Sequence, residues 1–218
     1  VTGSERDLAM VPLVVEMITH NTSLLSDTSR QGVLHLVNKL MDPTSGQNTQ
    51  SMANILSNIA DSDFTNTSTS NLFTETMSTF SKSILSVKSA NDKATIIQTR
   101  NFYLVVDLKN KALIENTRTN TTKGDFIEIP ELPQLDSGEI GVTIIDYPRN
   151  PYNYSSYQVD NPVIDIKFFQ HGQLVSLRNL ATPLNINIQK TQISRCSAPE
   201  KETRCVYWNE TMSSWESD

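Results

Sequence analysis

Residues 163–190, VIDIKFFQHGQLVSLRNLATPLNINIQK, hold the pattern that decides the fold. Apolar residues occupy every second position in two runs, Ile164, Ile166 and Phe168 in the first and Leu184, Ile186 and Ile188 in the second. Successive side chains of a β-strand point to opposite faces, so a period of two predicts strands with one face buried. Asn and Gln fill the alternate positions of the second run, which makes it the clearest such strand in the sequence.

The first ninety residues have the period of a helix instead. Apolar positions spaced i, i+3, i+4 and i+7 form two stripes: Val33, Leu36, Val37 and Leu40; and Met52, Ile55, Leu56 and Ile59. A third stripe, four turns long, consists of Phe73, Met77, Phe80, Ile84 and Val87. A further helix is expected over about residues 7–20, with a break or kink at Pro12. The polar segment 62–71, SDFTNTSTSN, predicts an exposed loop between the second and third stripes.

The order of these patterns predicts the fold class. Strand periodicity also occurs over residues 102–108 and 140–144, between turns rich in Pro, Gly and Asn. Helices that all precede the strands favour an antiparallel sheet over a parallel one. We therefore predict an α+β protein, with a helical subdomain over residues 1–90 and an antiparallel β-sandwich subdomain over residues 91–218.

Composition excludes several kinds of partner. The chain has 218 residues, 19% of them charged, and a net charge of −6 without a basic stripe, so we expect no nucleic-acid partner. The longest early apolar run, residues 10–18, is interrupted by Pro12 and Glu16 and is too short to span a bilayer. The sequence begins without a secretion-signal pattern, so we expect it to be a piece of a longer protein.

The sequence holds no recognisable catalytic motif. A Gly-rich phosphate loop, a His-Glu-x-x-His helix, a nucleophile elbow and a Cys-x-x-Cys pair are all missing from it. His20, His35 and His171 have no Ser, Cys or Asp in a local arrangement typical of catalysis. We therefore predict no catalytic residue, no metal site and no cofactor, and the sequence does not support an enzyme.

The two cysteines and the sequons bear on the compartment. Cys196 and Cys205 lie nine positions apart, which fits either a disulfide across a hairpin neck or two free thiols in a reducing cell. Five N-x-Ser/Thr sequons are candidate N-glycosylation sites: Asn21, Asn66, Asn120, Asn153 and Asn209. A similar number would arise by chance in a chain so rich in Asn, Ser and Thr, so the count is compatible with secretion without establishing it.

The tail, CVYWNETMSSWESD over residues 205–218, holds both tryptophans and one of the two cysteines. A turn between Trp208 and Trp215 would let both rings cover the end of the sandwich. The tail resembles the start of the proteolysis-site motif in GAIN domains, the autoproteolysis-inducing domains of adhesion G-protein-coupled receptors and polycystin-like proteins. The matching residues are Cys205, Val206, Tyr207, Trp208 and Trp215. Residues 163–190 resemble the two core strands before that motif, closer to the polycystin-like branch.

This resemblance implies a helical subdomain followed by a β-sandwich, the order read from the patterns above. In the family the motif continues through further cysteines to a His-Leu-Thr/Ser tripeptide, whose hydroxyl attacks the preceding peptide bond. The sequence stops at Asp218, before that tripeptide, so no catalytic residue is carried over. The family pattern pairs Cys205 with a later cysteine, so that pairing and a Cys196–Cys205 disulfide both stay open.

The resemblance implies an extracellular module of a membrane-anchored cell-surface protein, tethered through regions outside this chain and with no ligand identified. Such a module holds a following C-terminal segment non-covalently and relays force or ligand signals. One alternative is a self-cleaving domain that cuts beyond Asp218. Another is an unrelated secreted adhesive sandwich, in which loop 147–157, YPRNPYNYSSY, contacts ligands instead of packing as a Pro-rich loop.

Overall fold

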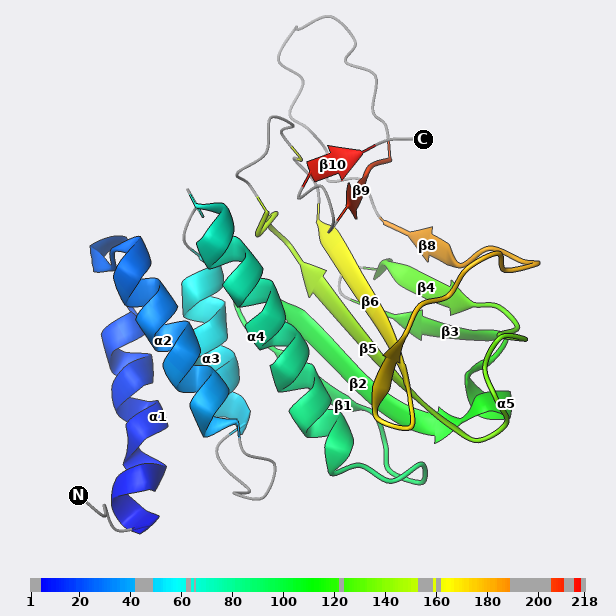
Figure 1. The fold of residues 1–218 in the computed structure, drawn as a ribbon, viewed down its shortest axis with the longest axis horizontal. Helices are drawn as coiled ribbons and strands as arrows, with labels where there is room; N and C mark the ends of the chain where they lie inside the picture. The colour runs from blue at the N-terminus through cyan, green and yellow to red at the C-terminus, as the bar shows by residue number, and fades with distance from the viewer. Residues whose placement is uncertain are drawn as a thin grey trace, which may run out of the picture.

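The computed structural model describes residues 5–41, 49–61, 64, 66–121, 124–152, 159, 162–188, 205–209 and 214–216. Four long helices come first: α1 (Glu5–Thr19), α2 (Asp27–Leu40), α3 (Thr49–Ala60) and α4 (Thr67–Ser86), with a 3-10 turn η1 (Thr22–Leu24) after α1 and a short α5 (Lys111–Ile114) among the strands. The strands are β1 (Thr95–Gln98), β2 (Tyr103–Asn110), β3 (Thr117–Asn120), β4 (Phe126–Ile129), β5 (Glu139–Tyr147), β6 (Val163–Gln170), β7 (Gln173–Val175), β8 (Asn185–Asn187), β9 (Tyr207–Asn209) and β10 (Ser214–Glu216). Figure 1 shows the four long helices on one side of the strands and α5 at the far end of the central sheet.

The helical layer follows the predicted apolar stripes, with three corrections. Helix α1 continues through Pro12, so a break there was wrong. Helix α4 begins at Thr67, so the predicted exposed loop 62–71 was partly wrong. Its cap is Asn66, whose side chain accepts a hydrogen bond from the Ser68 amide at 2.8 Å. The last position of the third stripe, Val87, lies beyond the end of α4 and is exposed.

The central sheet has five antiparallel strands in the order β1-β2-β5-β6-β7. One face packs against the helices through residues such as Leu104, Val106 and Phe169, which share a core with the buried stripes of α3 and α4. Gly141 of β5 lies where a side chain would overlap Leu85 of α4. The missing side chain therefore lets the helix approach the sheet closely.

The other face of the central sheet packs against a second sheet, ordered β3-β4-β8. Val105, Val142 and Ile144 of the first sheet share a core with Ile127 and Ile129 of the second. Two antiparallel sheets enclosing a core, preceded by helices, confirm the α+β class and give three layers (Figure 1). The change from helices to strands lies between α4 and β1, while the division into subdomains at residue 90 stays a prediction.

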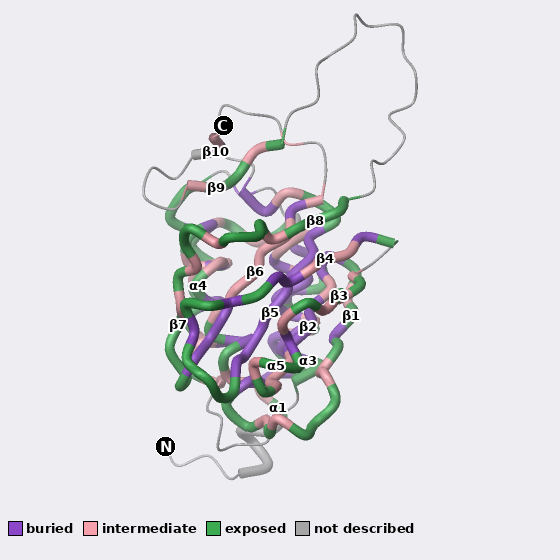
Figure 2. The backbone as a smooth tube through the Cα atoms, turned by 90° about the vertical axis from the view of Figure 1, so that its right-hand side faces the viewer, coloured by how far each residue is buried: buried purple, intermediate pink, exposed green. Residues whose placement is uncertain are grey.

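The strand expected to have one buried face was predicted wrongly. β8 spans only Asn185–Asn187, and all three residues are exposed. Figure 2 shows the contrast between β8 in green and the buried strands of the central sheet in purple. In the described part of the chain, no helix is long and apolar enough to cross a membrane.

Candidate functional site

The C-terminal tail forms a small antiparallel hairpin from β9 and β10. The Cα atom of Trp208 is paired with that of Trp215, and Tyr207 is paired with Glu216. This pairing confirms the expected chain reversal between the two tryptophans. The Trp208 side chain lies outside the described residues.

A carboxylate ties the two strands of the hairpin together. The Tyr207 hydroxyl donates to Glu216 Oε2 at 3.1 Å, and Asn209 Nδ2 donates to Glu216 Oε1 at 3.1 Å. Hydrogen bonds to an ionised group are stronger than neutral ones. The sequence analysis missed Glu216, although pairing positions 207 and 216 around the expected turn would have found it.

Trp215 fixes the hairpin to the body of the protein. Its side chain is 5% exposed, and its ring meets that of Tyr152 edge-on, with centroids 5.8 Å apart and an interplanar angle of 74°. Tyr152 belongs to the loop after β5, where its backbone amide donates to Asn150 Oδ1 at 2.9 Å. Val206 packs against the same core. The motif residues Val206 and Trp215 therefore anchor the tail where the helices meet the central sheet.

The aromatic residues of loop 147–157 that the structure describes, Tyr147 and Tyr152, are buried. The Tyr147 and Phe73 ring centroids lie 6.2 Å apart, which joins the loop to α4. Burial, and to a smaller extent Tyr152 and Asp165, raises the pKa of Tyr147 well above its ordinary value. Pro151 is buried beside these two tyrosines, whereas Pro148 and Arg149 are exposed, so the loop is packed in the core only in part. Tyr154 and Tyr157 lie outside the described residues.

Strand β8 has an outer edge that no described strand pairs with. It is the last strand of its sheet, and among the described residues it pairs only with β4. Ile186 lies opposite the fully buried Ile127, so both residues face the core side of the sheet. Ile186 is nevertheless 42% exposed, as is Ile188. On the facing sheet, Ile164 and Ile166 of β6 are only half-buried, so apolar surface on both sheets is incompletely covered here.

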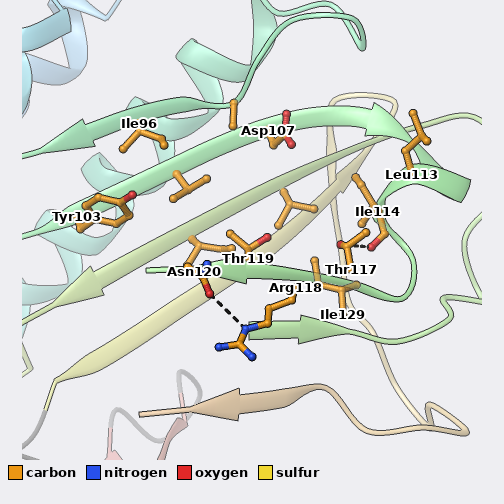
Figure 3. Close-up of a pocket in the computed structure, with 14 residues that line it drawn as sticks. Ile96, Tyr103, Asp107, Leu113, Ile114, Thr117, Arg118, Thr119, Asn120 and Ile129 are labelled. Carbon is orange, nitrogen blue, oxygen red and sulfur yellow. Dashed lines mark hydrogen bonds between the residues drawn. The ribbon is translucent and has the colours of Figure 1, made fainter. Parts of the chain in front are cut away.

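A cleft of about 430 Å³ opens on the opposite side of the sandwich, between β1–β2 and β3 (Figure 3). Its floor is apolar and includes Val105, Val142 and Ile144. At the rim, Arg118 Nε donates to Asn120 Oδ1 at 3.2 Å. The described lining residues hold hydroxyls and one carboxylate, Asp107, but no nucleophile with an adjacent base.

The remaining predicted site residues do not converge. Cys205 is exposed and free among the described residues, while Cys196 lies outside them, so their pairing stays a prediction. Among the sequon asparagines, Asn21, Asn66 and Asn120 are exposed, and Asn209 is half-buried. Asn153 lies outside the described residues.

The three histidines, His20, His35 and His171, are exposed and lie far apart in the chain. Within the described ranges no group of three or more His, Cys, Asp or Glu residues could hold a metal ion.

No protein-family model and no curated protein sequence matches the chain. Among solved structures, its fold is similar to the full extracellular region of zebrafish Gpr126/Adgrg6, with a TM-score of 0.70 and 16% sequence identity. The likeness covers 100% of this chain and 32% of that one, so this chain spans about a third of the similar protein's length. At this identity the similarity is one of fold.

Proposed function

We propose that this chain is the GAIN-like extracellular module of a membrane-anchored cell-surface protein. In this proposal it holds a following C-terminal strand non-covalently along the free edge of β8 and relays force or ligand signals by releasing it. Three features support the proposal: the similarity of fold to the extracellular region of Gpr126/Adgrg6, the tail that resembles a proteolysis-site motif, and the position of that tail at the end of the sheets.

The exposed, core-facing side chain of Ile186 in β8 carries the proposal. A strand added beside β8 would cover Ile186 and Ile188 and extend the second sheet over the half-buried Ile164 and Ile166 of β6. Free strand edges present unpaired backbone groups to such a strand, and pockets for alternate side chains then select it.

The short length of β8 would allow an added strand to be released from it. Because β8 has three residues, an added strand makes few main-chain hydrogen bonds with it. Most of the binding free energy must then come from burial of apolar side chains on both partners. Tension along the added strand would break this contact within a short extension, as a force-sensitive module requires.

Hydrogen exchange tests the proposal by comparing the chain ending at Asp218 with the protein carried through its natural extracellular reading frame. We expect amide exchange over residues 186–188 to slow by about tenfold or more in the longer protein, because an added strand would engage the free edge. Ile186→Asp should remove this protection. Leu174→Asp, at another exposed apolar position on an edge strand, is the matched control and should leave it intact. Equal exchange in the two proteins contradicts a strand held at β8.

A further inference from the structure

The outer face of helix α1 is apolar from Met10 to Ile18. Every exposed residue between positions 10 and 19 is a large hydrophobic one, with exposed fractions from 40% to 78%: Met10, Leu13, Val14, Met17 and Ile18. The exposed residues of the neighbouring α2 are polar or glycine instead: Thr28, Ser29, Gly32, His35 and Lys39. Large exposed apolar patches usually mark interaction sites, and we call these five residues of α1 the α1 stripe.

Helix α1 cannot turn to bury the stripe, because its opposite face is already fixed to α3. Val15 lies in the helical core. Asn54 Nδ2 donates to Glu16 Oε1 at 2.8 Å, and Asn58 Nδ2 donates to Thr19 Oγ1 at 3.2 Å. These two inter-helix hydrogen bonds set the rotation of α1, so the α1 stripe is held outward.

The spacing of the α1 stripe fits a helix as the partner. Its members follow i, i+3, i+4, i+7 and i+8, the spacing of a helix face that packs against another helix. The buried residues of α3 use the same spacing inside the bundle. We propose that an amphipathic helix from the same, longer polypeptide packs along the α1 stripe.

The size and place of the stripe favour a tethered helix over a second copy of this chain. The stripe covers nine residues, about 13 Å of helix, and one contact of that length falls short of the roughly 1,200–2,000 Å² buried in stable interfaces. A segment of the same polypeptide needs far less contact, because its effective concentration is already on the order of millimolar. Helix α1 is the first element of the described fold and lies at the side away from the sheet, where a helix adjacent in sequence can reach it (Figure 1).

The methionines provide the test without any substitution. Met10 and Met17 lie in the stripe, whereas Met52 and Met77 are buried in the core. Oxidation by hydrogen peroxide, followed by mass spectrometry, is measured on residues 1–218 and on the protein extended through its natural reading frame. We expect Met17 to oxidise about tenfold or more slowly in the longer protein, with Met52 and Met77 slow in both, since methionine oxidation follows exposure.

A substitution pair makes the test specific. In the longer protein, Met17→Glu should restore fast oxidation of Met10, because a charge in the contact expels the partner helix. Leu113→Glu, at an exposed apolar position outside the α1 stripe, should leave Met10 protected. Equal Met17 oxidation in the long and short proteins overturns the proposal. If Met17 in residues 1–218 alone oxidises more slowly as the protein concentration rises, and the protein has the mass of a dimer, the proposal is overturned in favour of a second copy of this chain.

Discussion

Replacing Trp215 with alanine is expected to release the C-terminal hairpin while the central sheet stays folded. Two-stranded hairpins are marginal by themselves, so the position of β9 and β10 depends on what they pack against. The described anchor is the Trp215 side chain, 5% exposed and edge-on to Tyr152. The two hydrogen bonds that Glu216 accepts from Tyr207 and Asn209 join the two strands to each other.

The expected effect follows from the burial of Trp215. Truncating a buried aromatic residue to alanine lowers the free energy of unfolding by about 3–5 kcal/mol. An edge-to-face ring pair contributes roughly 0.5–1.5 kcal/mol of that loss. Since about 1.4 kcal/mol corresponds to a factor of ten, opening of the hairpin should become at least about 100-fold more frequent. Trp215 is one of many members of the core between α4 and the central sheet, so we expect that core to remain closed without its ring.

Hydrogen exchange measured by mass spectrometry reports both parts of this prediction. Amides of residues 205–209 and 214–216 should exchange much faster in Trp215→Ala, while those of β2 and β5 should keep their rates. Tyr207→Phe is the control, since it removes one hydrogen bond from a half-exposed side chain and should accelerate exchange by about tenfold at most. Unchanged protection of the hairpin in Trp215→Ala, or joint unfolding of hairpin and sheet, would refute the anchoring role.

Three further predictions concern stability. Gly141→Ala should lower the free energy of unfolding by about 1–3 kcal/mol through overlap with Leu85, and Leu85→Ala in the same chain should relieve part of that loss in a double-mutant cycle of denaturant unfolding. The contribution of Tyr147 to stability should be constant below about pH 10 and fall above it, because Tyr147 ionises near pH 10 when unfolded but only at higher pH when buried. Tyr147→Phe should flatten this part of the pH profile of urea unfolding. Asn66→Ala should lower the free energy of unfolding by about 0.5–2 kcal/mol, because it removes the cap of α4. Ser68→Ala abolishes the same sequon but keeps the cap, so it should leave the melting temperature nearly unchanged.

The sequence predicted the elements in which apolar residues recur with the period of a helix or a strand. The stripe from Met52 to Ile59 is fully buried in α3, and the alternation over residues 140–144 lies in β5. It failed where burial depends on distant partners. Val87 continues the period of α4 but lies past its end, and Ile186 alternates like a core residue although no described strand covers it.

The anchoring of the tail was only partly predictable. Trp215 stands out in the sequence, and its burial agrees with the expectation of a covered sandwich end. Its partner Tyr152 comes from a loop more than sixty residues away, and no local pattern indicates that contact. The hydrogen bonds of Glu216 with Tyr207 and Asn209 depend on the register of the hairpin, which follows once positions 207 and 216 are paired around the expected turn.

The central claim is that the sandwich holds a following strand without a covalent bond. The most direct measurement places a specific protease site after Asp218 in the protein carried through its extracellular reading frame, cuts it, and passes it over a native sizing column. The account predicts that the downstream segment elutes with residues 1–218 after cutting, and that it separates in denaturant or in the Ile186→Asp variant. A downstream segment that leaves at once under native conditions would contradict the account.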